Sequence, residues 1–206
     1  MKQFLVDNAE TMTDWWDEAI YLLETLVMKA HHQDDNGMDL EFFAGSVKLK
    51  GSNKAASFRE KMEDEEARPT AGNRAHTDIR KPLGDIFHRY IESVKDSQRN
   101  PKKHKLRKLT VIIFTDGKWE GMSNKHAVED QIVQFVKDLK AVQKQSLMER
   151  QVSFEFIQFG FDPDATYRLQ RLDDELPYRD VPCVVQSLPF PLASRSLIPL
   201  QRYRRY

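Results

Sequence analysis

The sequence predicts a doubly wound α/β fold, in which helices cover both faces of a mostly parallel, open β-sheet. Residues 111–114 form a continuous apolar run, which is typical of a strand that is buried on both faces. A second short apolar run at residues 4–7 ends in an acid, and residues 38–42 alternate with period two, as a half-buried strand does. Because amphipathic helical stretches separate these segments, the pattern indicates a Rossmann-like parallel sheet.

Apolar residues at helical spacing predict the helices between the strands. Thr13 and Asp14 are candidate N-caps of the first helix, and Asp162 is a candidate N-cap of the last one. The predicted helices lie at residues 16–30, 55–67, 79–94, 128–142 and 163–176. Two more strands are predicted at residues 152–159 and 181–185, and Pro182 places the latter at an edge of the sheet, because a central strand needs the N–H that proline lacks.

The length of 206 residues and the hydrophobic content of 40% fit one globular domain with an ordinary core. We assign residues 1–187 to this domain. From residue 188 to residue 206 the chain loses its periodicity and mixes prolines with apolar residues before a basic and aromatic end. This segment is predicted to be an irregular C-terminal tail.

The charge balance narrows the class of partner, and the cysteine content indicates the cellular compartment. Lys+Arg and Asp+Glu are equal at 32 each, so the chain lacks the global attraction that marks nucleic-acid or membrane-surface proteins. No apolar run is long enough to span a bilayer. The single Cys183 excludes an internal disulfide framework and fits a reducing compartment. We therefore expect an intracellular, cytoplasmic protein that binds neither nucleic acid nor membrane.

Polar residues gather where two predicted strands end. Asp7 opens a loop that continues to Thr11, and Asp116 stands at the end of the strand that contains the apolar run at residues 111–114. If these strands are neighbours, the two acids meet at the carboxyl edge of the sheet, where open α/β sheets bind ligands. Thr77 lies at the mouth of the helix predicted at residues 79–94 and could close the third side. Carboxylates and hydroxyls of this kind suit Mg²⁺ or Mn²⁺.

The order of these motifs resembles that of a von Willebrand factor type A domain, particularly of the intracellular, fungal-like stand-alone type. That family carries a metal-ion-dependent adhesion site, with Asp-x-Ser-x-Ser after the first strand, a Thr in a later loop and an Asp after the fourth strand. The resemblance covers roughly residues 3–187. It implies that Thr11 binds the metal through its hydroxyl and that Thr77 binds it directly or through water. It further implies that Asp7 and Asp116 hold coordinated waters.

The resemblance also implies a non-catalytic protein-interaction domain. In the family, a carboxylate from a partner protein completes the metal site. Glu10, Lys118 and Trp119 lie in the loops that follow the two strands and are the candidate partner contacts. Trp119 is the strongest of them on residue type, since tryptophan is enriched in interface hot spots.

Ala9 departs from the family pattern, because it stands where one of the two metal-binding serines is expected. Two outcomes follow from this substitution. A water could fill the vacancy, since Mg²⁺ accepts aqueous ligands, and the affinity would fall. Alternatively, the site binds no metal and the domain serves as a binding surface without it.

An enzymatic alternative also starts at Asp7. The segment from Asp7 to Thr11 resembles the first motif of haloacid-dehalogenase-like phosphatases, in which a strand-end Asp attacks phosphorus and a second Asp two residues later acts as the general acid. Here Ala9 takes that second position, so the leaving group has no proton donor. A receiver-like phosphoacceptor is a third possibility, but its acidic pair and its later lysine are missing.

Overall fold

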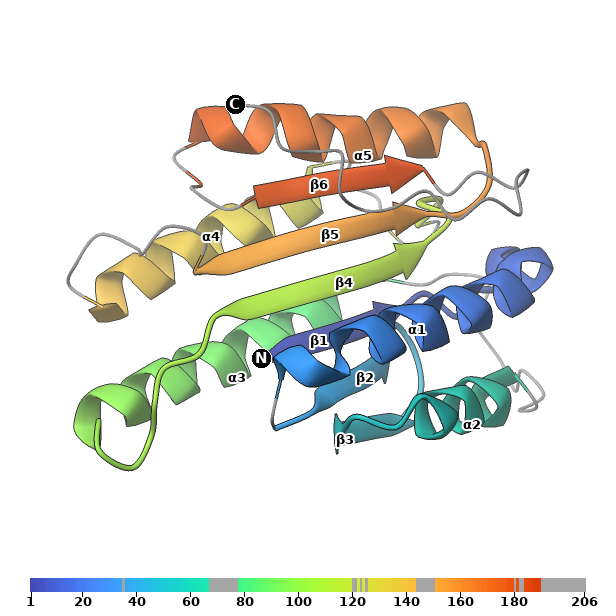
Figure 1. The fold of residues 1–206 in the computed structure, drawn as a ribbon. Coiled ribbons are helices and arrows are strands. Elements are labelled where there is room, and N and C mark those ends of the chain that lie inside the picture. The colour runs from blue at the N-terminus through green and yellow to red at the C-terminus, as the bar shows by residue number, and fades with distance from the viewer. Residues whose placement is uncertain are drawn as a thin grey trace.

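A six-stranded β-sheet forms the centre of the molecule in the computed structural model (Figure 1). The strands are β1 (Lys2–Val6), β2 (Met38–Phe42), β3 (Lys48–Ser52), β4 (Leu109–Thr115), β5 (Val152–Gln158) and β6 (Val184–Pro189). Their order across the sheet is β3-β2-β1-β4-β5-β6. All neighbours are parallel except β2 and β3, which are antiparallel. The predicted doubly wound, mostly parallel α/β fold is confirmed.

The structure describes residues 1–34, 36–66, 78–119, 122, 124, 126–143, 151–179, 181 and 184–189. Its helices are α1 (Trp16–Ala30), α2 (Ala55–Glu66), α3 (Arg80–Arg99), α4 (Ala127–Gln143) and α5 (Pro163–Glu175). Three 3₁₀ segments complete the list: η1 (Glu10–Trp15), η2 (His31–Gln33) and η3 (Leu176–Arg179). Within these ranges no helix is both long and apolar enough to cross a membrane.

Helices pack on both faces of the sheet. Figure 1 shows α1 in front of the sheet and α3 and α4 behind it. Phe4 and Val6 of β1 belong to the hydrophobic cluster of α1 and α2, whereas Leu5 belongs to the cluster that contains α3, α4 and α5. Successive side chains of a strand point to opposite faces, so the last three residues of β1 are apolar without alternation. The same holds for β4, which explains its uninterrupted apolar run.

The first helix begins differently from the prediction. Thr13 and Asp14 do not cap α1, because both lie inside η1, and the residue before α1 is Trp15. The Thr13 hydroxyl donates to the carbonyl of Glu10 at 2.7 Å, within the same 3₁₀ segment. The prediction for the last helix is confirmed, since the Asp162 carboxylate accepts a hydrogen bond from the amide of Ala165.

Two strands differ from the prediction at the edges of the sheet. β3 was not predicted from the sequence; it pairs with β2 and is mostly exposed. β6 begins at Val184 and runs to Pro189, so it takes in two residues that the sequence assigned to the tail. It is an edge strand, as expected. Pro182, Cys183 and residues 190–206 lie outside the described residues.

Glu155 of β5 gives the fold a pH dependence that can be measured. Burial raises the pKa of the Glu155 carboxyl above its ordinary value of 4.5, and the nearby charge of Lys2 opposes this only in part. Just above pH 4.5 the folded protein therefore binds more protons than the unfolded chain, and stability falls as the pH rises through this window. We expect Glu155→Gln to unfold at higher urea concentration than the wild type at pH 7, with the difference vanishing below about pH 4.5.

Glu60→Gln serves as the control for this experiment, because the Glu60 side chain is 69% exposed. It should leave the pH dependence of stability unchanged. An increase in stability of Glu155→Gln that was the same at every pH would contradict the assignment.

Candidate functional site

The predicted site lies where β1 and β4 end side by side. Val6 pairs with Phe114, and the amide of Asp7 donates to the Phe114 carbonyl at 2.8 Å, so Asp7 is held opposite Thr115. The chain runs outward from this point in both directions, to β2 and β3 on one side and to β5 and β6 on the other. This is the topological switch point of the sheet, where ligands of open α/β folds bind.

Thr115 connects the two strand ends through its hydroxyl. Its Oγ1 donates to Asp7 Oδ2 at 2.7 Å and accepts from the amide of Gly117 at 2.9 Å and from the indole Nε1 of Trp119 at 3.0 Å. Asp7 and Thr115 are fully buried. One hydroxyl thus fixes the Asp7 carboxylate and the start of the loop after β4.

The second oxygen of Asp7 organises the loop after β1. Asp7 Oδ1 accepts a hydrogen bond from the amide of Ala9 at 3.1 Å. The neighbouring Asn8 is buried and bridges to the loop after β2, where its amide group both donates to and accepts from the backbone of Ala44. Its Nδ2 also donates to the buried Glu65 near the end of α2 at 2.8 Å. Polar side chains therefore join three loops at this edge.

Asp116 differs from Asp7 in how its oxygens are used. Asp116 Oδ1 accepts from the amide of Lys118 at 3.0 Å. Asp116 Oδ2 is buried and has no hydrogen-bond donor within the described part of the chain. The Lys118 ammonium forms an ion pair with this carboxylate, with Nζ 3.8 Å from Oδ2. A buried carboxylate oxygen without a donor is unusual, because its desolvation is not offset by a hydrogen bond.

The loop after β4 is clamped by Arg168 of α5. The Arg168 guanidinium donates through Nη1 to the carbonyl of Gly117 and, at 3.0 Å, to that of Lys118. It also stacks over the Trp119 ring, 5.6 Å from the centroid, and these two side chains line a small pocket together with Met122 and Asn124. Gly117 has a φ of +76°, and a Cβ there would lie 3.0 Å from the Cβ of Ala165. Glycine therefore allows α5 to approach the site.

The structure places the other predicted site residues as follows. Glu10 is exposed at the start of η1, and Thr11 follows it, partly buried. Thr77 lies outside the described residues. Trp119 was expected to face a partner, but it is only 4% exposed, because its indole is fixed to Thr115 and packs in the core. It is therefore not an exposed interface residue.

Three residues of the site did not emerge as candidates from the sequence. Asn8 and Thr115 had a detectable signal, since each is a polar residue next to a strand-end acid. Arg168 had none, because a lone arginine in an amphipathic helix has the same pattern as a solvent-facing one.

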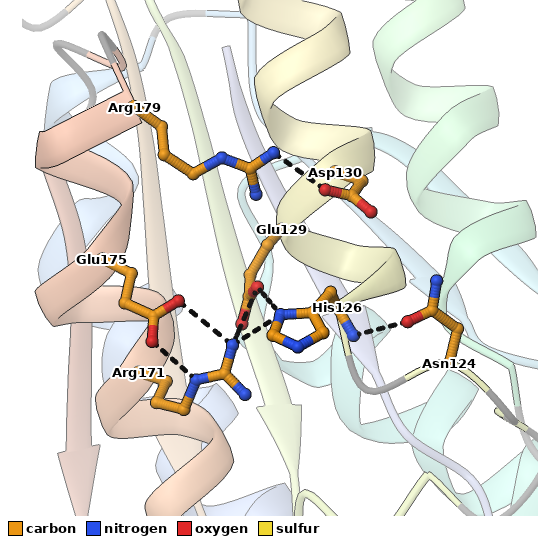
Figure 2. Close-up of polar contacts among 7 residues, drawn as sticks. All are labelled: Asn124, His126, Glu129, Asp130, Arg171, Glu175 and Arg179. Atoms are coloured by element: carbon orange, nitrogen blue, oxygen red, sulfur yellow. Dashed lines mark hydrogen bonds and ion pairs between the residues drawn. The ribbon is translucent and has the colours of Figure 1, made fainter.

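A second polar cluster joins α4 to α5 (Figure 2). His126, Glu129 and Glu175 offer ligand atoms that lie within 4.8 Å of one another, a set that zinc-type metals use. Arg171 contacts all of them. Its Nη2 lies 3.0 Å from Glu129 Oε1, 3.1 Å from Glu175 Oε2 and 2.6 Å from His126 Nδ1.

Arg171 gives this cluster a structural role. Glu129 is only 2% exposed, and the guanidinium supplies the positive charge that such a buried carboxylate requires. Hydrogen bonds from Arg171 also lower the pKa of Glu175 below its ordinary value. Figure 2 shows the guanidinium between the two carboxylates, so the cluster acts as an ion-pair clamp between the helices.

Comparisons with known proteins leave the family open. A scan against protein-family models finds no match, and a search of curated proteins finds none either. Among solved structures, the chain is similar to a conserved hypothetical protein, BatB, from Bacteroides thetaiotaomicron. The identity is 12%, the match covers 92% of this chain and 90% of that chain, and the TM-score is 0.40.

The hydroxyl of Thr115 should be essential to the site. In Thr115→Val the shape is retained, but the buried Asp7 carboxylate loses a donor and two N–H groups lose their acceptor. We expect the free energy of unfolding to fall by about 3 kcal/mol in urea denaturation. Thr110→Val is the control on the same strand. Within the described part of the chain the Thr110 hydroxyl bonds only to the Ser153 hydroxyl, at 3.1 Å, so the substitution should cost less than about 1 kcal/mol. Equal losses in both variants would refute this role.

Arg171→Met should test the clamp, because methionine retains much of the aliphatic volume and removes the charge. The buried Glu129 then lacks its guanidinium partner, and we expect a loss of about 3 kcal/mol in the free energy of unfolding. Arg179→Met removes a half-exposed partner of Asp130, 2.8 Å away, and should cost less than about 1 kcal/mol. The clamp assignment fails if the two variants are equally stable.

Proposed function

We propose that this chain is a non-catalytic protein-interaction domain of the von Willebrand factor type A kind. Its binding face is the carboxyl edge of the sheet between β1 and β4, where a Mg²⁺-type cation and an acidic side chain of a partner protein meet. One observation supports the proposal most directly: Asp116 Oδ2 is buried at the switch point and has no hydrogen-bond donor within the described residues. An oxygen in this state is suited to bind a cation or its water.

The donor set fits a hard divalent ion. Asp7 and Asp116 supply carboxylate oxygens, and Mg²⁺ and Mn²⁺ prefer oxygen ligands and retain several waters. Both oxygens of Asp7 accept hydrogen bonds, yet a carboxylate has about four lone-pair sites, so Asp7 can also accept from metal-bound water. The resemblance adds Thr11 and Thr77 as hydroxyl ligands. The metal would supply positive charge for the partner's carboxylate.

Ala9 would weaken such a site. Its side chain brings no hydroxyl, but its amide donates to Asp7 Oδ1 and thereby keeps the loop in place. We therefore propose an affinity lower than that of a complete adhesion site, with a water in the position of the missing ligand.

The environment of Asp7 also supports a binding role over phosphatase chemistry. A nucleophilic carboxylate has to reach phosphorus, whereas Asp7 is fully buried and its oxygens accept from Thr115 and Ala9. The position of the general acid is an alanine. Both features support the view that the domain is not an enzyme.

Isothermal titration of Mn²⁺ and Mg²⁺ into the protein tests the proposal. We expect saturable binding by the wild type and at least about tenfold weaker binding by Asp116→Asn, which keeps the shape and removes the charge. Glu155→Gln, which removes another largely buried carboxyl in β5, should bind as the wild type does. Absence of binding by the wild type would refute the cation site.

A separate assay addresses the enzymatic alternative. Hydrolysis of p-nitrophenyl phosphate should not exceed the buffer rate with any of these ions present. Activity that disappeared in Asp7→Asn would overturn the non-catalytic proposal, since only the phosphatase mechanism makes Asp7 a nucleophile.

A further inference from the structure

We infer that Lys118 is a built-in counterion of Asp116 that competes with a divalent cation for the same carboxylate oxygen. In this view the ammonium neutralises Asp116 when no cation is bound and moves away when one binds. The inference rests on the proposed function, because it concerns how the proposed cation site is regulated.

The geometry of the Lys118–Asp116 ion pair allows the ammonium to be displaced. Lys118 Nζ lies 3.8 Å from Asp116 Oδ2, which exceeds hydrogen-bonding distance, so the contact is a charge interaction without a hydrogen bond. The Asp116 side chain is 3% exposed, whereas that of Lys118 is 39% exposed. The carboxylate is therefore fixed, and the ammonium can swing into solvent on a flexible stem.

The backbone keeps Lys118 at this position. Its amide donates to Asp116 Oδ1, and its carbonyl accepts from Arg168. The residues on either side, Gly117 and Trp119, both have left-handed backbone conformations, with φ values of +76° and +43°. A bulky residue adopts such a φ only when its surroundings enforce it. The backbone of Lys118 is thus anchored beside Asp116, while its side chain can move.

Competition follows from the burial of Asp116. A buried carboxylate needs a positive charge nearby, and either the ammonium or a divalent ion can provide it. Both cannot approach the same oxygen without repelling each other. Cation binding would release the Lys118 ammonium to the rim of the edge, where it would attract an acidic side chain of the partner. Lys118 would then serve the free site as a counterion and the loaded site as a partner contact.

Mn²⁺ titration of Lys118→Met tests this inference. Methionine keeps a long aliphatic stem and removes the charge, so Mn²⁺ should bind roughly fivefold more tightly than to the wild type. Without cation, the thermal midpoint of Lys118→Met should lie below that of the wild type, and Mn²⁺ should raise it by a larger amount. Lys118→Arg keeps the charge and should bind Mn²⁺ more weakly than Lys118→Met does.

Lys29→Met is the control for net charge, because Lys29 is an exposed residue in the last turn of α1. It should bind Mn²⁺ as the wild type does. If Lys118→Met does not fold, Lys118→Gln provides the same test with a polar neutral side chain.

The outcomes separate the two proposals. Equal Mn²⁺ affinity of the wild type and Lys118→Met would overturn the counterion inference and leave the cation site standing. Tighter Mn²⁺ binding by Lys118→Met than by the wild type would support the inference. Absence of binding by both proteins would overturn the cation site and the inference with it.

Discussion

The hydrogen bond between the Thr115 hydroxyl and the Asp7 carboxylate is the contact on which the carboxyl edge of the sheet depends. It joins residues 108 positions apart in the chain, at 2.7 Å and in full burial. The same hydroxyl accepts from the loop that follows β4, so the conformations of both loops are coupled to one side chain. The contact exists because β1 and β4 are parallel neighbours in which Val6 pairs with Phe114, so that the residues that follow, Asp7 and Thr115, lie side by side.

Much of the fold could be predicted because it follows from local patterns. Strands buried on both faces have continuous apolar runs, and helices that cover them have one apolar stripe, so β1, β4 and α4 were visible in the sequence. The meeting of Asp7 and Asp116 followed from topology, since parallel strands end at a common edge. β3 could not be found in this way, because an exposed edge strand with two lysines and a glycine has no apolar pattern.

The remainder of the site depends on contacts between distant segments. Tryptophan is a residue type that is common in interfaces. Trp119 is nevertheless buried, because its indole donates a hydrogen bond to the Thr115 hydroxyl and its backbone is left-handed. Arg168 and Arg171 lie in one helix, yet the first holds a loop backbone and the second neutralises a buried carboxylate. Long cationic side chains are usually exposed, so neither role can be read from the sequence.

The exposed, irregular β3 also affects how the molecule behaves toward other copies of itself. An outermost strand presents unpaired backbone groups that could extend the sheet between molecules. Here Lys50 is exposed on this strand, and Lys48 pairs with Glu41 of β2 at 2.9 Å. Gly51 has a φ of +58°, and the register with β2 shifts between Met38 and Leu40. Charge and local twist both oppose edge-to-edge pairing, so the polar composition that hides β3 in the sequence protects the sheet from aggregation.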